Sequence, residues 1–214
     1  MDALFSDRAE AGRLLAAALP PLPDGPVVVL GVPRGGVVVA QEVARALNAP
    51  LDVFVTRKIG MPGYAEYAVG AIAPGGVCVV NPNVKVSMEA LNAVVSREQD
   101  ELNRRIRQYR GGVPVPDVQD RVVVVVDDGV ATGFTARAAL RALRACHPRH
   151  LVFATPVGPV ETVKRLEDAA DRVVVLKTPH DFMAVGASYT SFPEVSDADV
   201  QAILQSTQRQ APPA

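Results

Sequence analysis

A run of five valines at residues 122–126 constrains the fold of this chain more than any other feature. β-Branched residues favour strands, and a strand without polar alternation has to be covered on both faces. Strands of this kind lie at the centre of parallel sheets that have helices packed on either side. The run therefore predicts an α/β protein in which residues 122–126 form a central strand.

Helical and extended patterns alternate along the rest of the chain. Helices are expected at 4–19, 36–47, 88–110, 134–146, 159–169 and 197–205, the last with Ser196 as its N-cap. Further strands are expected at 27–30, 51–56, 151–155 and 173–176. This alternation predicts a doubly wound, mostly parallel sheet flanked by helices. The glycine-rich stretch 57–81 is interpreted as a flexible hairpin loop with two short strand-like pieces, and 177–195 as irregular.

The length of 214 residues suits a single domain, expected over 1–206 with its core at about 25–180. The polar, proline-bearing residues 207–214 are expected to form a disordered tail. Lys and Arg number 22 against 23 Asp and Glu, so no overall basic field favours nucleic acid. No apolar run approaches the ~20 residues of a membrane span.

The two cysteines, Cys78 and Cys146, have no metal-ligand spacing and are interpreted as reduced thiols. Acidic residues occur within the first ten positions, which is atypical of a secretory signal peptide. Both observations predict a cytoplasmic protein.

The segment VVVVVDDGVATGFT at 122–135 contains the strongest functional pattern. Asp127 and Asp128 follow the predicted strand, and ligands of open α/β sheets bind at the carboxyl ends of strands. Small residues then lead into a helix, and such a loop offers backbone N–H groups and a positive helix end to a phosphate. Thr132 and Thr135 add hydroxyl donors.

Two adjacent carboxylates would repel a phosphate, so we expect them to bind another part of the same ligand. Carboxylates accept strong hydrogen bonds from sugar hydroxyls, and a divalent cation would relieve the remaining repulsion. The pattern therefore indicates a ribose 5′-phosphate. The alternative is that the two acids cap a helix and the loop is a plain connection. A Walker loop and the dinucleotide pattern G-x-G-x-x-G are both missing from the sequence.

This segment resembles the phosphoribosyl-pyrophosphate (PRPP) signature of type I phosphoribosyltransferases, and the order of elements agrees over about 25–180. The resemblance implies that Asp127 and Asp128 hold the ribose hydroxyls. It also implies a 5′-phosphate site formed by Gly129, Val130, Ala131, Thr132, Gly133, Phe134 and Thr135. In the family, Mg²⁺ is required and is held mainly by the substrate, so no protein side chain is assigned as a metal ligand.

The turn GVPRGG at 31–36 follows the first predicted strand. Glycines allow close approach of the backbone to an anion, and Arg34 supplies a fixed positive charge. By resemblance, Pro33, Arg34, Gly35 and Gly36 bind the pyrophosphate, and the peptide bond between Pro33 and Arg34 is expected to be cis. The alternative is a plain turn with an exposed arginine.

Arg57 and Lys58 begin the 57–81 stretch, where the family has a mobile loop that closes over the site. They would neutralise charge on the departing pyrophosphate and, with Arg34, Asp127 and Asp128, complete the expected catalytic residues. A solvated basic pair at a strand end is an equal alternative.

The 177–195 segment takes the place of the small hood that covers the base in the family. We expect His180, Asp181, Phe182 and Tyr189 to bind the base, with the two rings stacking on it. The alternative is that both rings pack the segment onto the sheet. Ala131 stands where 6-oxopurine members have an aspartate, and the sequence leaves the acceptor base open.

Three functions are compatible with these residues. The first is a phosphoribosyltransferase of nucleotide salvage that transfers the 5-phosphoribosyl group from PRPP to a nitrogenous base and releases pyrophosphate. The second is a non-catalytic regulatory protein that senses PRPP or a nucleotide. The third is a component that works beside a fused or partner hydrolase. The expected partners are PRPP and a base, with a homodimer possible and neither nucleic acid nor membrane expected.

Overall fold

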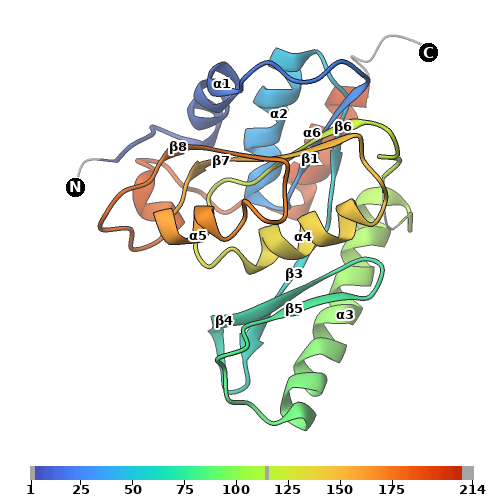
Figure 1. Ribbon diagram of the computed structural model, residues 1–214, viewed down its shortest axis with the longest axis vertical. Coiled ribbons are helices and arrows are strands. Elements are labelled where there is room, and N and C mark those ends of the chain that lie inside the picture. Colours follow the sequence, from blue (N-terminus) through green and yellow to red (C-terminus); the bar gives the residue numbers. More distant parts are fainter. Residues whose placement is uncertain (1–2, 114–115, 209–214) are drawn as a thin grey trace.

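The computed structural model describes residues 3–113 and 116–208 and has a five-stranded parallel sheet at its centre (Figure 1). The strands lie in the order β2-β1-β6-β7-β8. Their bounds are β1 (Val27–Gly31), β2 (Leu51–Val53), β6 (Val122–Val126), β7 (His150–Val157) and β8 (Arg172–Lys177). The predicted doubly wound, mostly parallel sheet is confirmed.

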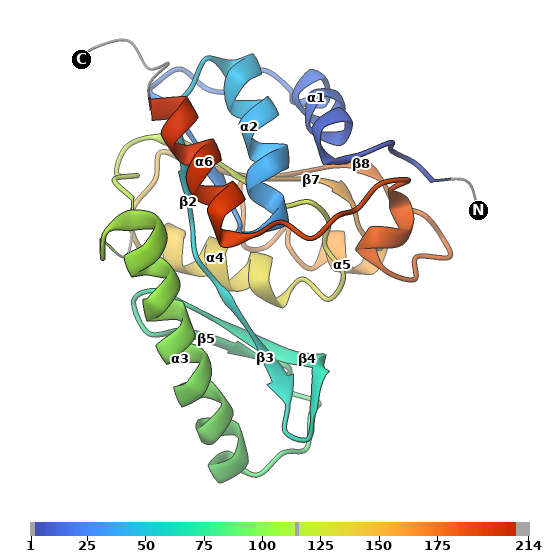
Figure 2. The same ribbon diagram turned by 180° about the vertical axis from the view of Figure 1, so that it is seen from behind.

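Helices cover both faces of this sheet, as the two opposite views show (Figures 1 and 2). One face carries α1 (Arg8–Ala18), α2 (Gly35–Leu47) and α6 (Asp197–Gln208). The other face carries α4 (Phe134–Arg144) and the short α5 (Val160–Lys164). This three-layer arrangement buries the strands from both sides, which explains why their sequences lack polar alternation.

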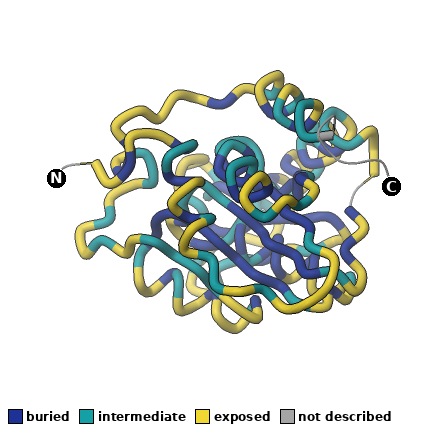
Figure 3. Tube along the Cα trace, turned by 90° about the horizontal axis from the view of Figure 1, so that it is seen from above, coloured by how far each residue is buried: buried dark blue, intermediate teal, exposed yellow. Residues whose placement is uncertain are grey.

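The valines of β6 lie at the centre of the protein, and all five are fully buried. Val124 and Val126 pack with the α1, α2 and α6 layer, whereas Val123 and Val125 pack with the α4 layer. Burial of one valine side chain contributes about 1.5–3 kcal/mol. Figure 3 shows the same pattern as buried strands enclosed by partly exposed helices. The prediction of a central strand is confirmed.

A second, antiparallel sheet contains the hairpin that the sequence predicted within 57–81. It consists of β3 (Arg57–Met61), β4 (Tyr64–Ala73) and β5 (Val77–Val80), and the 23-residue helix α3 (Met88–Arg110) packs beside it (Figure 2). The two predicted strand-like pieces correspond to β4 and β5, which pair as an antiparallel hairpin. The sequence did not indicate β3 or the full ten-residue length of β4, because glycine and alanine in β4 have weak strand propensity. A Cβ atom on Gly70 would lie 2.3 Å from the carbonyl oxygen of Val79, so glycine permits the close pairing of β4 with β5.

Several predicted boundaries differ from the structure. Helix α1 begins at Arg8 rather than at residue 4, because Asp7 caps it by accepting a hydrogen bond from the N–H of Glu10. The predicted helix 159–169 shortens to the five residues of α5. Ser196 caps α6 as predicted, accepting from the N–H of Asp199.

Helix α6 continues to Gln208, so the predicted tail at 207–214 does not begin at residue 207. The remainder of that prediction, 209–214, lies outside the described residues. Within the described ranges, no helix is both long and apolar enough to cross a membrane.

Candidate functional site

Two loops meet where the sheet changes its direction of winding. The chain passes from β1 to β2 toward one edge and from β6 through β7 to β8 toward the other. The carboxyl ends of β1 and β6 therefore flank the crevice in which open α/β proteins bind ligands. The N–H of Val32 donates to the carbonyl of Val126 at 2.8 Å, which holds the two loops side by side. The structure thus brings together residues 33–36 and 127–135.

Gly35 and Gly36 allow the first turn to pass directly beside the two aspartates. A Cβ atom on Gly35 would lie 1.9 Å from Oδ2 of Asp128. A Cβ atom on Gly36 would lie 2.8 Å from the carbonyl oxygen of Val126 and 3.0 Å from Oδ1 of Asp127. The closest contacts at Gly36 are with backbone atoms, so that position requires glycine, whereas a side chain at residue 35 would displace the Asp128 carboxylate and Arg8. The peptide bond between Pro33 and Arg34 is cis, as the resemblance implied.

The carboxylates of Asp127 and Asp128 lie in a poorly solvated environment. Burial raises the pKa of Asp127 well above its usual range, and the neighbouring charge of Asp128 raises it further. Burial also raises the pKa of Asp128, although Arg8 opposes the shift. Oδ1 of Asp127 accepts a hydrogen bond from the N–H of Asp128 at 2.9 Å. Hydrogen-bond donors or a cation from a ligand would stabilise the ionised pair.

Arg8 is a site residue that the sequence analysis missed. Its Nε donates to Oδ2 of Asp128 at 2.7 Å, and its Nη1 donates to the carbonyl of Pro193 at 2.7 Å. Its guanidinium carbon lies 3.6 Å from the centre of the Phe192 ring, a cation–π contact. Arg8 therefore connects α1, the acid pair and the segment before α6.

The position of Arg8 on its helix offers a signal that could have found it. Leu4 and Leu14, two apolar residues of the expected helix at 4–19, are exposed. The buried face of α1 instead comprises Arg8, Ala11, Gly12 and Leu15. An arginine at helical spacing with three small or apolar residues indicates a buried cation that needs an acidic partner.

The loop after β6 borders an open cavity of about 560 Å³, lined by residues 129–135. Gly133, at φ +79°, is the N-cap of α4 and supplies no side-chain cap, so the first-turn N–H groups remain available to a ligand. The loop is held from behind, because the hydroxyl of Thr162 donates to the carbonyl of Ala131 at 2.7 Å. Val130 is buried and anchors the loop in the core. This arrangement can bind a phosphate without a positive side chain.

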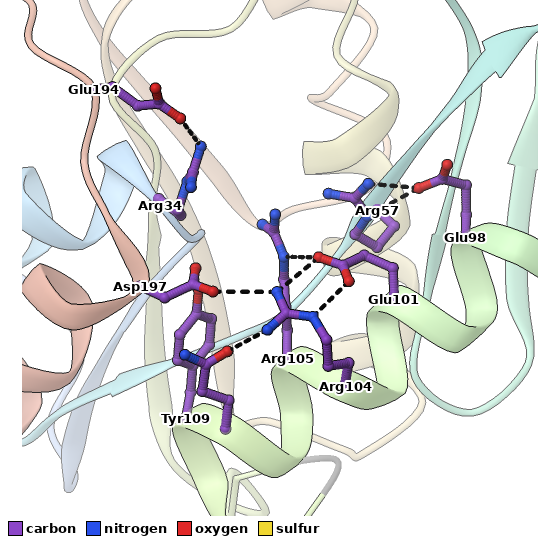
Figure 4. A network of polar contacts seen from close by, with 10 residues as sticks. Arg34, Arg57, Glu98, Glu101, Arg104, Arg105, Tyr109, Glu194 and Asp197 are labelled. Atoms are coloured by element: carbon purple, nitrogen blue, oxygen red, sulfur yellow. Dashed lines mark hydrogen bonds and ion pairs between the residues drawn. The ribbon is translucent and has the colours of Figure 1, made fainter.

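The predicted basic residues near the first turn are each paired with a glutamate. Figure 4 shows Arg34 directed at Glu194 and Arg57 directed at Glu98. Nη2 and Nε of Arg57 lie 2.6 and 3.0 Å from Oε2 of Glu98 on α3. Arg57 is thus tied to α3 and is not among the residues that line the 560 Å³ cavity.

Lys58 does line that cavity, and its Nζ lies 3.4 Å from Oε2 of Glu66. The structure therefore separates the two neighbouring residues that the sequence grouped together. Strand geometry is the reason, because successive side chains of β3 point to opposite faces.

A polar network fixes α3 to the start of α6 (Figure 4). Arg104 donates to Glu101 at 2.6 and 2.9 Å and to Asp197 at 3.1 Å. The hydroxyl of Tyr109 also donates to Asp197. Hydrogen bonding to Arg104 and to Arg105 lowers the pKa of Glu101 to about 2. The helix beside the second sheet is thereby tied to the segment that carries Glu194.

The hood residues divide into packed and exposed side chains. Tyr189 is buried, its ring centre lies 5.4 Å from that of Phe5 and 5.0 Å from that of Phe192, and its hydroxyl donates to the carbonyl of Asp128 at 2.5 Å. Phe182 is half-buried against the same cluster. These contacts favour the packing alternative for Tyr189.

His180 and Asp181 are exposed. Their role in binding a base stays a prediction, as does that of Phe182.

The chain is similar to known proteins of one family. The model of the phosphoribosyl transferase domain matches residues 8–191. The chain belongs to the phosphoribosyl transferase domain family. A solved structure, TT1426 from Thermus thermophilus, is 48% identical in sequence with a TM-score of 0.78. The match covers 94% of this chain and 98% of that one.

Two proteins from Mycobacterium tuberculosis, MT0597 of strain CDC 1551 / Oshkosh and Rv0571c of strain ATCC 25618 / H37Rv, are each 46% identical over 210 residues. Their names assign them provisionally to the phosphoribosyl transferases. The match covers 96% of this chain but 47% of each relative. The chain therefore spans about half the length of the curated relatives it matches. The family resemblance drawn from residues 122–135 is confirmed.

Proposed function

We propose that this protein transfers the 5-phosphoribosyl group of PRPP to a nitrogenous base and releases pyrophosphate. The observation that carries the proposal is the half-buried acid pair, Asp127 and Asp128, which lies between two loops suited to anions at the switch point of the sheet. The site therefore has one anion-binding loop on each side of an acid pair. A ligand with hydroxyls between two phosphate-bearing ends matches this arrangement. PRPP has that order, with its ribose between a 5′-phosphate and a pyrophosphate.

Each part of the substrate has a proposed set of partners. Asp127 and Asp128 accept hydrogen bonds from the ribose hydroxyls, and the N–H groups of residues 129–135 bind the 5′-phosphate. The turn at 33–36 binds the pyrophosphate through its backbone and through Arg34. Lys58 extends into the cavity on the 5′-phosphate side and adds positive charge there.

The chemical step exchanges one bond at C1 of the ribose for another. The base nitrogen forms the new bond and releases its proton to the solvent, while the bond to the pyrophosphate oxygen breaks and its electron pair leaves with pyrophosphate. Positive charge develops on the ribose, and negative charge develops on the leaving group. The acid pair stabilises the first charge, and Arg34 stabilises the second. The protein contributes mainly position and electrostatics.

Mg²⁺ fits this site as a partner of the substrate. In the described part of the chain, His, Cys, Asp and Glu form no group of three or more that could hold a metal ion. Mg²⁺ commonly uses one or two carboxylates together with substrate phosphates and water. The ionised acid pair, whose pKa values are raised by burial, would be stabilised by the cation. Bound with PRPP, the ion supplies positive charge to the leaving pyrophosphate.

For the acceptor base, the proposal excludes the 6-oxopurines. Ala131 provides no carboxylate near the base, so hypoxanthine and guanine are expected to be poor acceptors. Phe182, His180 and Asp181 remain the proposed contacts of the base. Tyr189 would act indirectly, by holding the Asp128 carbonyl.

Release of pyrophosphate from PRPP with Mg²⁺, screened against a panel of purines and pyrimidines, tests the proposal. We expect base-dependent release by the wild type. Loss of each charge-assisted hydrogen bond in the double variant Asp127→Asn, Asp128→Asn should weaken PRPP binding by about 1.5–3 kcal/mol. A matched control replaces two exposed acids, Asp24→Asn and Asp117→Asn, and should bind PRPP as the wild type does.

The outcomes separate the functions. Tight PRPP binding without turnover of any base would favour a sensing protein over an enzyme. Unchanged PRPP affinity in the folded acid-pair variant would refute the ribose assignment in both.

A further inference from the structure

A second groove lies next to the phosphate loop and has a volume of about 590 Å³. The end of β5 with the turn that follows it forms one wall, and α4 and the α5 region form the other. This groove and the 560 Å³ cavity adjoin, because both are lined by Asn81, Thr132, Gly133, Phe134 and Arg165. Its size falls in the range of small-molecule sites.

The charged residues that line this groove are all arginines: Arg137, Arg141 and Arg165. Two of them, Arg137 and Arg141, lie one turn apart on α4 and do not line the other cavity. Their positive charges repel one another, and a bound anion would offset that repulsion. This pattern indicates a site for a ligand with several negative charges.

The arginines are only partly neutralised within the described residues. Nη2 of Arg137 donates to Asp168 at 2.7 Å, while its Nε is buried without a hydrogen-bond partner. Arg141 forms no ion pair with any described residue, and Arg165 donates to neutral oxygens, the carbonyl of Glu161 and the hydroxyl of Thr162. At least two guanidinium charges therefore face the groove without a carboxylate partner in the described part of the chain.

The rest of the lining suits an uncharged ring. The half-buried Phe134 supplies apolar surface, with the buried Val79 and Leu166 behind it, and the Asn81 and Asn83 amides supply hydrogen-bonding groups. We propose that this groove is a second binding site that takes a nucleoside polyphosphate, with its phosphates on Arg137, Arg141 and Arg165 and its base against the apolar wall. Guanidinium groups match phosphate oxygens in bidentate geometry, which favours phosphates over monovalent anions.

Calorimetric titration with ATP as the probe tests this site. Each charge-assisted contact is worth about tenfold or more in Kd, so the variant Arg137→Gln, Arg141→Gln should bind ATP at least ~10-fold more weakly than the wild type. The single variant Arg141→Gln, at an exposed position, should show a smaller loss in the same direction. The matched control Arg149→Gln, Arg172→Gln removes two exposed charges at the amino edge of the sheet and should leave the Kd unchanged.

Two results of this titration would overturn the proposal. One is a wild-type Kd for ATP weaker than about 1 mM. The other is a folded Arg137→Gln, Arg141→Gln variant that binds ATP as tightly as the wild type.

Titration of the same variants with PRPP and Mg²⁺ distinguishes this groove from the proposed catalytic site. We expect PRPP affinity to be retained while ATP affinity falls, and an equal loss of both would mean that the groove belongs to the PRPP site. Tripolyphosphate should compete with ATP, because it carries the charges that the arginines bind. Adenosine binding as tightly as ATP would overturn the assignment to an anionic ligand.

Discussion

The loop after β6 and the turn after β1 lie side by side at one edge of the sheet, but they offer a ligand different groups. The loop at 129–135 offers backbone N–H groups and borders an open cavity. The turn at 33–36 carries the guanidinium of Arg34, which is already paired with Glu194. Arg57, expected on the same side of the ligand, is also paired, with Glu98.

The backbone N–H groups are free and the guanidinium groups are paired because only the guanidinium groups carry a full charge. Neutral backbone donors need no counter-ion in the free protein, because water satisfies them. A guanidinium attracts the nearest carboxylate, so an anion that binds Arg34 has to displace Glu194. The side chain of Glu194 is 80% exposed, and exposed ion pairs are weak, so this displacement is inexpensive. Arg57 and Glu98 are 25% and 12% exposed, which makes that pair harder to separate.

The largest effect is expected where the two loops touch. Gly35→Ala would place a Cβ atom 1.9 Å from Asp128, and the resulting displacement should lower the free energy of unfolding by about 3 kcal/mol and abolish tight PRPP binding. Denaturant unfolding and PRPP titration measure both. Gly75→Ala is the control, because no atom lies within 4 Å of the added Cβ and only backbone strain of about 1 kcal/mol remains. A stable Gly35→Ala protein with normal affinity would mean that the loops move independently.

A smaller loss of stability is expected from Arg8→Gln. This change leaves Asp128 without its cation in an environment only 15% exposed, and we expect a loss of about 2 kcal/mol in urea unfolding. The double variant Arg8→Gln, Asp128→Asn should recover part of that loss, since no unpaired charge remains. Equal losses in the single and double variants would show that Arg8 acts through its packing on Phe192 instead.

Removing the charge of Glu194, which competes with the pyrophosphate for Arg34, should increase the affinity for PRPP modestly. Glu194→Gln releases Arg34, and PRPP binding should tighten about threefold, in keeping with the ~0.2–1 kcal/mol of an exposed ion pair. Glu66→Gln is the comparison on the 5′-phosphate side, where Lys58 and Glu66 are 3.4 Å apart. Weaker PRPP binding by Glu194→Gln would contradict the idea that Glu194 competes with the ligand.

The smallest effect concerns the pH dependence of stability at the acid pair. The pKa of Asp127 is raised in the folded protein, so its ionised form destabilises the fold at neutral pH and protonation stabilises it as the pH falls. Asp127→Asn cannot ionise and should raise the Tm at neutral pH by roughly 1–2 °C. The advantage should shrink toward pH ~4, where the carboxyl becomes protonated even when unfolded.

Thermal unfolding without PRPP between neutral and acidic pH measures this difference. Asp181→Asn, at an exposed position, is the control. A gap that widens as the pH falls would contradict the raised pKa.

The elements predicted well from sequence are those whose signal lies in contiguous residues. The five valines of β6 indicate a buried strand without reference to any other segment, and the acids and small residues that follow indicate a ligand loop. In the second sheet, β3 and the full length of β4 were missed because β4 is rich in glycine and alanine, and its pairing with β3 and β5 supplies the stability that its own propensity lacks.

The amino-acid pattern alone was sufficient for the family, the parallel sheet and the two loops at its carboxyl edge, because strand propensity and loop chemistry are local properties. The charge balance of the site depended on the folded chain. Arg8 meets Asp128 across 120 residues, and Glu194 meets Arg34 across 160 residues. Neither carries a local motif that names its partner. Such pairs form only after α1 and the segment before α6 have packed against the sheet, because long-range electrostatic contacts are set by tertiary position rather than by spacing along the chain.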